Sequence, residues 1–279
     1  MPTYIERMFE TYRNGVRLFH FEIFSKDENI VHFVSTRSGG VSDGAYESLN
    51  LGFSSEDDHR KVIENRRLVA AALGMEAGSM ITSRQVHGKA VRVIDREAIR
   101  DDSSHRGMAA VAADAMTTDR RRVCLMVVVA DCVPVLLYDS RRKVIGVAHA
   151  GWRGLVRGVI GSLVEAMQER FGCTPGDIRA GVGPSIGPCC YEVGPEVLAA
   201  VADSFGQTEK IVKEIDASGR GYLDLWQLAE TGLLGTGLVS ANIETARLCS
   251  SCHHEDFFSY RYHGPKSGRF AAGIMMGRR

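Results

Sequence analysis

One short segment combines a thiol and an imidazole in a way that suits metal binding. Two apolar runs, 133–138 and 144–149, flank a polar Asp-Ser-Arg-Arg-Lys turn at 139–143, a pattern typical of a β-hairpin. Antiparallel pairing around this turn brings Cys132 and His149 within one residue of facing each other. Their Cβ atoms would lie about 5 Å apart if directly opposed, and farther if diagonal. This separation suits two ligands of one ion.

A thiolate and an imidazole favour Zn²⁺ or copper over Mg²⁺ or Ca²⁺. The third ligand must come from another segment. His87 is the best candidate, because Gly88 beside it allows the backbone to approach closely. Two histidines and one cysteine would leave zinc a fourth position for water. One alternative stays open on the residues alone: Cys132 as a small buried hydrophobe and His149 as a core histidine with satisfied hydrogen bonds.

Further polar residues crowd the same end of the predicted hairpin and favour the metal site. Asp131 precedes the first strand, while Trp152 and Arg153 follow the second, and polar groups buried there would need partners. The segment 151–154 leads into a predicted helix, whose unpaired N–H groups would bind an anion together with Arg153. The alternative is a tight turn with a solvated arginine, which is preferred unless the substrate is anionic.

These residues need a layered framework to hold them. Val-rich runs with little polar alternation predict strands that are covered on both faces. They span 30–35, 90–94, 123–130, 133–138 and 144–149. Helical spacing predicts two helices, one opened by Asp57 and Asp58 and stopped by Gly74, the other over 154–171 and stopped by Gly172. Because strands alternate with helices, we expect an α/β or α+β layered fold.

The composition limits the class of protein. The 279 residues are 44% hydrophobic and 24% charged, and without repeats or linkers they predict one domain over 1–279. Lys plus Arg and Asp plus Glu both number 34, so no net charge attracts nucleic acid or an anionic membrane. No apolar run suits a signal peptide or a bilayer span, which predicts a cytoplasmic protein with a small-molecule partner. The oligomeric state stays open, a homo-oligomer included.

Seven cysteines, an odd number spread along the chain, do not suggest a disulfide framework. Cys249-Ser-Ser-Cys252 would be half of a zinc site or a redox pair, but the sequence has no second Cys-x-x-Cys at zinc-finger spacing. We interpret it as a loop with two free thiols, and Cys189-Cys190 in the Gly-rich loop 181–194 as structural. In an alternative, Cys249 or Cys252 supplies a fourth ligand, which would make the metal a structural clip in a small-molecule sensor.

Short motifs follow one another over most of the chain. They are HFVSTRSGGVSDGAYESLNLG at 32–52, Asn-Arg at 65–66, RQVHG at 84–88, ADA at 113–115, ADCVPVLLYD at 130–139, HAGWRG at 149–154, GPSIGPCCYEVG at 183–194, and FFSYR with a later Gly-Arg at 257–269. In order and spacing they resemble the YfiH family, also described as multicopper polyphenol oxidases or laccase-domain proteins. In that family the corresponding side chains bind zinc, which implies His87, Cys132 and His149 as ligands.

The resemblance implies a four-layer α/β/β/α sandwich with mixed sheets, similar to the catalytic domain of cytotoxic necrotizing factor toxins. It implies purine nucleoside and phosphate as substrates. The family's reaction is phosphorolysis of adenosine, inosine and methylthioadenosine to the base and (methylthio)ribose 1-phosphate, with adenosine deaminase activity besides. The implied substrate-pocket residues are Asn50, Arg66, Gln85 and Arg261. Their alternatives are a turn residue for Asn50, a solvated helix residue for Arg66 and a strand-end hydrogen bonder for Gln85.

The sequence departs from the family pattern directly after Arg261. Tyr262 and His263 stand where a second Arg and an Asp commonly follow. Without this arginine, the argument that a second guanidinium binds an anionic substrate is weaker. His263 is the residue that could take the place of the missing arginine.

Three chemistries fit these residues. For deamination we expect metal-activated water to attack the purine C6; for phosphorolysis Arg153 would hold phosphate near the ribose C1′ while the metal or Asp131 assists the leaving group. A second hypothesis makes Cys132 a thiolate nucleophile with His149 as its base, cleaving an amide such as a peptidoglycan precursor bond, an activity linked to some relatives. Copper-dependent phenol oxidation is a weaker alternative, because one His₂Cys set falls short of the several copper sites that laccase chemistry requires.

Overall fold

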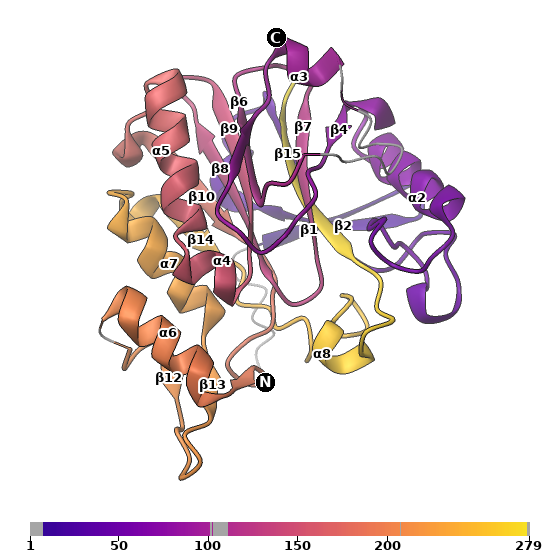
Figure 1. The fold of residues 1–279 in the computed structure, drawn as a ribbon. Helices are drawn as coiled ribbons and strands as arrows, with labels where there is room; N and C mark the ends of the chain where they lie inside the picture. Colours follow the sequence, from indigo (N-terminus) through magenta and orange to yellow (C-terminus); the bar gives the residue numbers. More distant parts are fainter. Residues whose placement is uncertain (1–7, 101, 103–110, 207, 278–279) are drawn as a thin grey trace.

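The computed structural model describes residues 8–100, 102, 111–206 and 208–277 (Figure 1). Its first six-stranded sheet has the strand order β1-β2-β3-β15-β7-β4, in which only β4 and β7 pair in parallel. These strands are β1 (Met8–Arg13), β2 (Val16–Phe21), β3 (Ile30–Ser35), β15 (Phe270–Met276), β7 (Cys124–Val129) and β4 (Met80–Ile81).

The second six-stranded sheet carries the predicted hairpin at its centre, in the order β14-β10-β8-β9-β6-β5. Its strands are β14 (Ile243–Thr245), β10 (Ile178–Val182), β8 (Val133–Asp139), β9 (Val144–Ala150), β6 (Ala115–Thr118) and β5 (Val91–Val93). A small sheet joins β11 (Glu192–Val193), β13 (Gly221–Leu223) and β12 (Val212–Lys213). All five strands predicted from the sequence are confirmed, with bounds that differ by at most one residue.

Helices lie on both outer sides of the two large sheets, with α5 and α7 on one side and α2 on the other (Figure 1). The helices are α1 (Glu22–Ser25), α2 (His59–Ala72), α3 (Arg96–Arg100), α4 (Trp152–Val156), α5 (Val159–Phe171), α6 (Pro195–Phe205), α7 (Leu225–Gly235) and α8 (Tyr260–His263). Helix α2 confirms the first predicted helix: the Asp58 side chain accepts a hydrogen bond from the Arg60 N–H at its start, and Gly74 beyond its end has φ +67°.

The prediction of one continuous helix over 154–171 is wrong. The chain forms two helices, α4 and α5, because Gly158 between them has φ +83°, a left-handed conformation that breaks the helical path. The apolar spacing hid the break, since Val156 and Val159 keep the helical period across it. Gly172, with φ +67°, ends α5 as predicted.

Strand β8 shows why the central strands are continuously apolar. Val133, Val135 and Leu137 belong to the buried cluster that contains α5 and α7 side chains. Leu136 and Tyr138 belong to another cluster, which contains side chains of the first sheet. Successive side chains of a strand point to opposite faces, so both faces of β8 are covered and every position is apolar.

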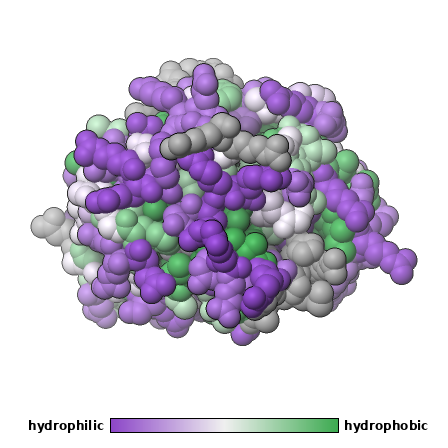
Figure 2. All heavy atoms as spheres, turned by 90° about the horizontal axis from the view of Figure 1, so that it is seen from above, coloured by the Kyte–Doolittle hydropathy of each residue, from purple (hydrophilic) through white to green (hydrophobic). Residues whose placement is uncertain are grey.

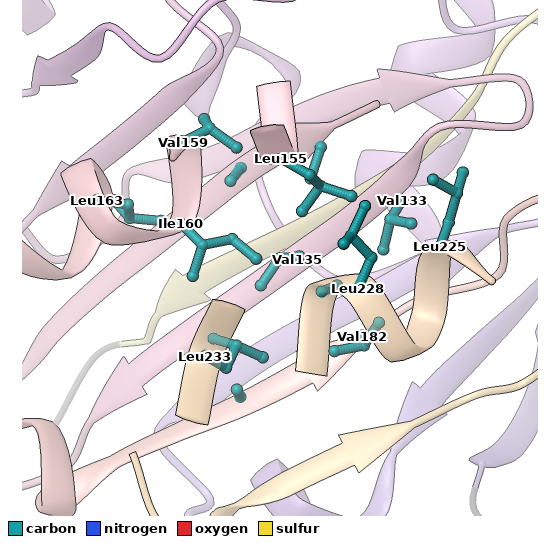
Figure 3. Packing of buried hydrophobic residues seen from close by; sticks show 14 of the residues in the cluster. Val133, Val135, Leu155, Val159, Ile160, Leu163, Val182, Leu225, Leu228 and Leu233 are labelled. Atoms are coloured by element: carbon teal, nitrogen blue, oxygen red, sulfur yellow. The ribbon is translucent and has the colours of Figure 1, made fainter. Parts of the chain in front are cut away.

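Three buried clusters hold the layers together. In the cluster of Figure 3, Val135 of β8, Leu163 of α5 and Leu228 of α7 pack in one group. A second cluster includes side chains from both large sheets, among them Phe270. The third includes Val69 of α2 together with side chains of the first sheet. The predicted mixed α/β class with mixed sheets is confirmed, while the finer four-layer order stays a prediction from the resemblance.

The surface is mixed in character. On the face seen in Figure 2, hydrophilic side chains dominate and hydrophobic ones form smaller patches between them. Within the described ranges, no helix has the length and apolar character needed to cross a membrane.

Candidate metal centre and substrate cavity

The structure brings together the three side chains that the sequence predicted as metal ligands. The Sγ atom of Cys132 lies 3.8 Å from Nε2 of His87, and the imidazole centroids of His87 and His149 are 4.8 Å apart. One potential ligand atom from each residue lies within 4.8 Å of the other two. His149 is buried, Cys132 is half-buried and His87 is exposed, so the set opens toward solvent on the His87 side.

The β8–β9 hairpin positions two of the three ligands. In the observed register, Val133 pairs with Ala150 and Pro134 pairs with His149. Cys132, which directly precedes β8, therefore lies diagonally opposite His149 instead of facing it. The hairpin prediction is confirmed with the diagonal arrangement, the second of the two that the sequence allowed.

Asp114, directly before β6, holds the third ligand against this hairpin. Its carboxylate accepts hydrogen bonds from His149 Nδ1 (2.8 Å) and from the backbone N–H groups of Val86 (3.1 Å), His87 (2.9 Å) and Gly88 (2.7 Å). These bonds support a strained turn, since His87 has φ +58°. They also leave Nε2 of His149 for a metal ion. Burial alone would raise the pKa of Asp114, but the hydrogen bonds from His149 and Gly88 lower it.

Sequence reasoning missed the role of Asp114. The Ala-Asp-Ala motif at 113–115 was a signal, but nothing in its spacing indicates a contact with two segments far away in the chain. A second missed residue is Gly151, which leaves room for the ligands. A Cβ atom at this position would lie 2.8 Å from Cys132 Sγ and 3.2 Å from His87 Cδ2.

The thiol of Cys132 is prepared for metal binding by its neighbours. Burial would raise its pKa, but the charge of His149 and hydrogen bonds from both histidines lower it to about 6. Burial lowers the pKa of His149, whereas Cys132 and Asp114 raise it to about 9. Both shifts favour a thiolate beside an imidazolium in the metal-free protein, and a cation can take the place of the imidazolium proton. A thiolate, two imidazoles and a carboxylate behind one of them form a donor set that fits zinc.

The three side chains line a cavity of about 890 Å³, a size that suits a small organic substrate. Among the described residues that line it, five are arginines and one is acidic. The arginines are Arg66, Arg84, Arg153, Arg261 and Arg269. The aromatic lining residues are Phe53, Trp152, Tyr191 and Tyr260. Of these two groups, the predictions named Arg66, Arg153 and Arg261 as binding residues and missed the others.

Two substrate candidates line the cavity while also bonding to the protein. Arg66 is buried and donates from Nε and Nη2 to the Leu51 carbonyl (3.0 and 2.9 Å), with its guanidinium 4.3 Å from the Phe53 ring centroid. Gln85 donates to the Val128 carbonyl (2.7 Å) and accepts from the Val128 N–H (3.0 Å). Arg66 is thus not a solvated helix residue. Gln85 bonds to the backbone of β7 at Val128 and also lines the cavity.

Asn50 does not line the cavity. It is fully buried, and its side-chain amide donates to Ser55 Oγ (2.8 Å) and Asp57 Oδ2 (2.9 Å). Its Oδ1 accepts from the N–H groups of Gly52 (3.1 Å) and Arg269 (2.8 Å). The Asn50 side chain therefore bonds to neighbouring protein groups. Through the Arg269 N–H it helps to position Arg269, which lines the cavity.

Asp131, the acidic lining residue, ties loops together. Its Oδ1 accepts from Ser250 Oγ (2.7 Å) and its Oδ2 from the Arg261 N–H (2.6 Å), while its carbonyl accepts from the Ile186 N–H (3.0 Å). Arg261 in turn donates from its guanidinium to the Cys190 carbonyl (2.8 Å). Both carboxylate oxygens of Asp131 thus have protein partners at the cavity wall.

The predicted anion site at the helix start needs a correction. Helix α4 spans only Trp152–Val156 before the break at Gly158, so it lacks the length of aligned peptide dipoles that the prediction assumed. Arg153 is exposed, and its guanidinium lies 4.5 Å from the Trp152 ring centroid. A contribution to anion binding there rests on the Arg153 charge.

Two further expectations are corrected by the geometry. His263 does not line the cavity: its Nε2 lies 2.7 Å from Arg37 Nη1, so it does not replace the missing arginine. Neither Cys249 nor Cys252 joins the His-Cys-His set, because both thiols gather with two other cysteines.

Known proteins resemble this chain over most of its length. A family described as multi-copper polyphenol oxidoreductase laccase matches residues 31–277. A purine nucleoside phosphorylase from Bacteroides thetaiotaomicron is 35% identical over 93% of this chain and 96% of its own length. The adenosine deaminase RL5 from an unknown prokaryotic organism is 37% identical over 90% of this chain and 96% of its own. The solved structure of Bacillus licheniformis hypothetical protein YfiH superposes with a TM-score of 0.88 at 32% identity, covering 95% of this chain and 97% of that one.

Both relatives are named as enzymes that act on purine nucleosides, so the prediction of an enzyme family is confirmed. The family match covers most of the chain, including every residue of the His-Cys-His set. The chain therefore belongs to the multi-copper polyphenol oxidoreductase laccase family, the YfiH-like group that its motifs predicted.

Proposed function

We propose that this chain is a zinc-dependent purine nucleoside phosphorylase, with adenosine deamination as a second activity of the same site. Its substrates would be adenosine, inosine and methylthioadenosine, and its products the free base and ribose 1-phosphate or methylthioribose 1-phosphate. The observation that carries the proposal is the presence of five arginines in one cavity with the His-Cys-His set. The relatives named purine nucleoside phosphorylase and adenosine deaminase support it.

The arginines favour phosphorolysis over reactions with neutral reactants. The chain as a whole has no net charge, yet its cavity has five guanidinium groups against one carboxylate. Such an excess of positive charge in a concave site attracts and orients an anion. Phosphate is the anionic substrate of phosphorolysis, and Arg153 beside the His-Cys-His set is our candidate for holding it near the ribose C1′.

The aromatic lining suits the purine. Trp152 and Tyr191 each lie against a guanidinium, with Arg153 4.5 Å from the Trp152 ring centroid and Arg261 5.3 Å from that of Tyr191. Flat rings and guanidinium planes are the surfaces on which nucleobases stack. A nucleoside placed there would have its base on the aromatic side and its ribose toward the metal ligands.

His87, Cys132 and His149 would hold the zinc ion. When bound, zinc supplies Lewis-acid polarisation at its open coordination position. The residues of the chain do the rest: Asp114 keeps the His149 ring in the orientation that presents Nε2, and the arginines orient phosphate.

The test is a product assay. Purified protein supplied with inosine, phosphate and zinc should yield hypoxanthine and ribose 1-phosphate, and omission of phosphate should abolish the release of base. Cys132→Ala should lose this activity. Cys124→Ala is the matched control, because Cys124 is a buried thiol that starts β7, about 16 Å along the strand from the cavity end at Val129. If the wild type forms no more product than Cys132→Ala, the proposal is refuted.

The deaminase activity has its own readout. Adenosine without phosphate should yield inosine, and this activity should be lost together with phosphorolysis in Cys132→Ala. Loss of only one activity in that variant would show that the two reactions use different sites.

A second candidate function is amide hydrolysis by a Cys132–His149 pair. The lowered pKa of the Cys132 thiol favours it, because a thiolate is the nucleophilic form. Activity that survives chelation and is abolished by a thiol alkylator would favour this candidate. Loss on chelation with rescue by zinc would favour the phosphorylase, and several copper ions per chain in a metal analysis would favour phenol oxidation.

A further inference from the structure

Four cysteine thiols form a second cluster outside the His-Cys-His set. The Sγ atom of Cys252 lies 3.4 Å from Sγ of Cys189 and 3.4 Å from Sγ of Cys190. With the Sγ atom of Cys249 included, all four sulfurs lie within 4.8 Å of one another. The Cys-x-x-Cys motif therefore has its partners in the vicinal pair Cys189-Cys190, which precedes it by about 60 residues.

We propose that Cys189, Cys190, Cys249 and Cys252 bind a second zinc ion, a structural one with four thiolate ligands. Zn–S bonds of about 2.3 Å in a tetrahedron place sulfur atoms about 3.8 Å apart. The observed separations, from 3.4 Å to at most 4.8 Å, bracket this value. Four thiolates closing a tetrahedron are the donor set of structural zinc sites.

The arrangement of the sulfurs favours an ion over a disulfide. A disulfide joins two sulfurs, whereas Cys252 Sγ is equally close to two others. Either pairing would leave a third thiol and Cys249 outside that bond. One ion uses all four sulfurs, and their protons leave to solvent when it binds.

The backbone holds both halves of the cluster in place. One half is a turn in which the Cys190 N–H donates to the Gly187 carbonyl (3.0 Å), and the other is a turn in which the His253 N–H donates to the Cys249 carbonyl (2.9 Å). The Gly187 N–H points at Cys249 Sγ (3.2 Å), the kind of N–H···S contact that stabilises a thiolate ligand. The sulfurs thus converge from two hydrogen-bonded turns.

The same two turns are joined directly. Ser185 forms a parallel bridge with Cys249, and the Ser250 N–H donates to the Ser185 carbonyl (2.9 Å). The ion would close this junction where Cys189 and Cys252 are exposed.

The cluster adjoins the substrate cavity. Tyr191, which follows the vicinal pair, lines the cavity, and the Cys190 carbonyl accepts from the Arg261 guanidinium (2.8 Å). On the other side, Ser250 donates to Asp131 (2.7 Å). The second zinc would therefore position Tyr191 and Arg261, and this consequence alone rests on the proposed function.

The test is zinc counting by elemental analysis of protein purified under reducing conditions. The wild type should hold two zinc ions per chain. The triple variant His87→Ala/Cys132→Ala/His149→Ala should hold one, and so should Cys189→Ser/Cys252→Ser. Cys173→Ser is the matched control, a thiol outside both sets, and should keep two. A triple variant without zinc would overturn the proposal, whether or not the enzyme is a phosphorylase.

A second measurement on the unmutated protein covers the case in which the cysteine variant fails to fold. Iodoacetamide labelling followed by peptide mass spectrometry should find Cys189 and Cys252 protected, although their side chains are exposed, and should find them labelled after chelation. Full labelling before chelation, or a disulfide among the four cysteines, would contradict the second zinc site. If the site also positions the cavity wall, Cys189→Ser/Cys252→Ser should raise KM for the nucleoside more than it lowers kcat.

Discussion

Asp114→Asn should separate the support of the metal ligands from the ligands themselves. Four donors converge on this carboxylate, with His87 N–H and His149 Nδ1 on Oδ1 and Gly88 N–H on Oδ2, while the Val86 N–H is shared. An asparagine places an NH₂ group where one oxygen was. In either amide orientation this group meets N–H donors instead of an acceptor, so at least one hydrogen bond is lost and one repulsive contact is created.

The magnitude follows from what the carboxylate holds. Loss of an outer partner of a metal-binding histidine lowers metal affinity about 10- to 100-fold, or roughly 1.4–2.8 kcal/mol. Buried donors left without an acceptor cost about 1–3 kcal/mol of folding free energy. Asp114→Asn should therefore weaken zinc binding at the His-Cys-His set by at least about tenfold and destabilise the protein by a similar free energy.

The assay is zinc competition against a chromophoric chelator, together with urea unfolding of the metal-free protein. Asp139→Asn is the matched control, because Asp139 is a buried carboxylate at the other end of the same hairpin whose Oδ1 accepts from the N–H groups of Arg141 and Arg142 (2.9 Å each). It should keep its zinc affinity, because its amide oxygen can still accept both hydrogen bonds and the residue lies away from the metal ligands. If Asp114→Asn binds zinc within threefold of the wild type, the account of Asp114 as the support of the site is refuted.

Three other predictions test separate parts of the structure. Gly151→Ala should lower zinc affinity and activity about tenfold or more, because its Cβ would meet Cys132 Sγ at 2.8 Å; an unchanged zinc Kd would contradict this. Leu163→Ala should lower the free energy of unfolding, measured with urea, by about 2–5 kcal/mol while KM for the nucleoside stays constant. Burial lowers the pKa of His32 to about 3 in the native state, so below about pH 6.5 the unfolded chain binds a proton that the native state does not bind. The free energy of unfolding should therefore fall by about 1.4 kcal/mol for each pH unit below about 6.5. His32→Gln should remove this part of the slope measured from about pH 7 to 5.

Local patterns could predict the strands and the hairpin but not the full site. The apolar runs predicted β8 and β9 to within one residue, because burial on both faces leaves a strong local signal. The break at Gly158 left none, since the apolar period continues across it. Asp114 stayed hidden because its partners, His87 and His149, lie 27 and 35 residues away and meet it only through the folded sheet.

The cysteine cluster is a second feature that local sequence patterns could not predict. A search for a second Cys-x-x-Cys could not find it, because the partners of Cys249 and Cys252 are adjacent in sequence. They are placed by the parallel bridge between Ser185 and Cys249, a tertiary contact. The resemblance named Asn50 as a pocket residue, whereas Asn50 does not line the cavity, because a motif gives the position of a residue in the sequence and not its contacts.

The carboxylates of the site constrain the chemistry that it can support. Asp114 and Asp131 both use their two oxygens to hold backbone and side-chain donors, and Asp131 is the only acidic residue among the described residues that line the cavity. A reaction that needs a carboxylate to take a proton from water would have to break one of these supports. Phosphate reaches the site already anionic and needs no such base, so the arginines can hold a nucleophile that is ready to react. Deamination needs water to lose a proton, and a zinc ion held by His87, Cys132 and His149 would supply the required lowering of the water pKa. The phosphorylase reaction therefore makes the fewest demands on groups that the fold has already used.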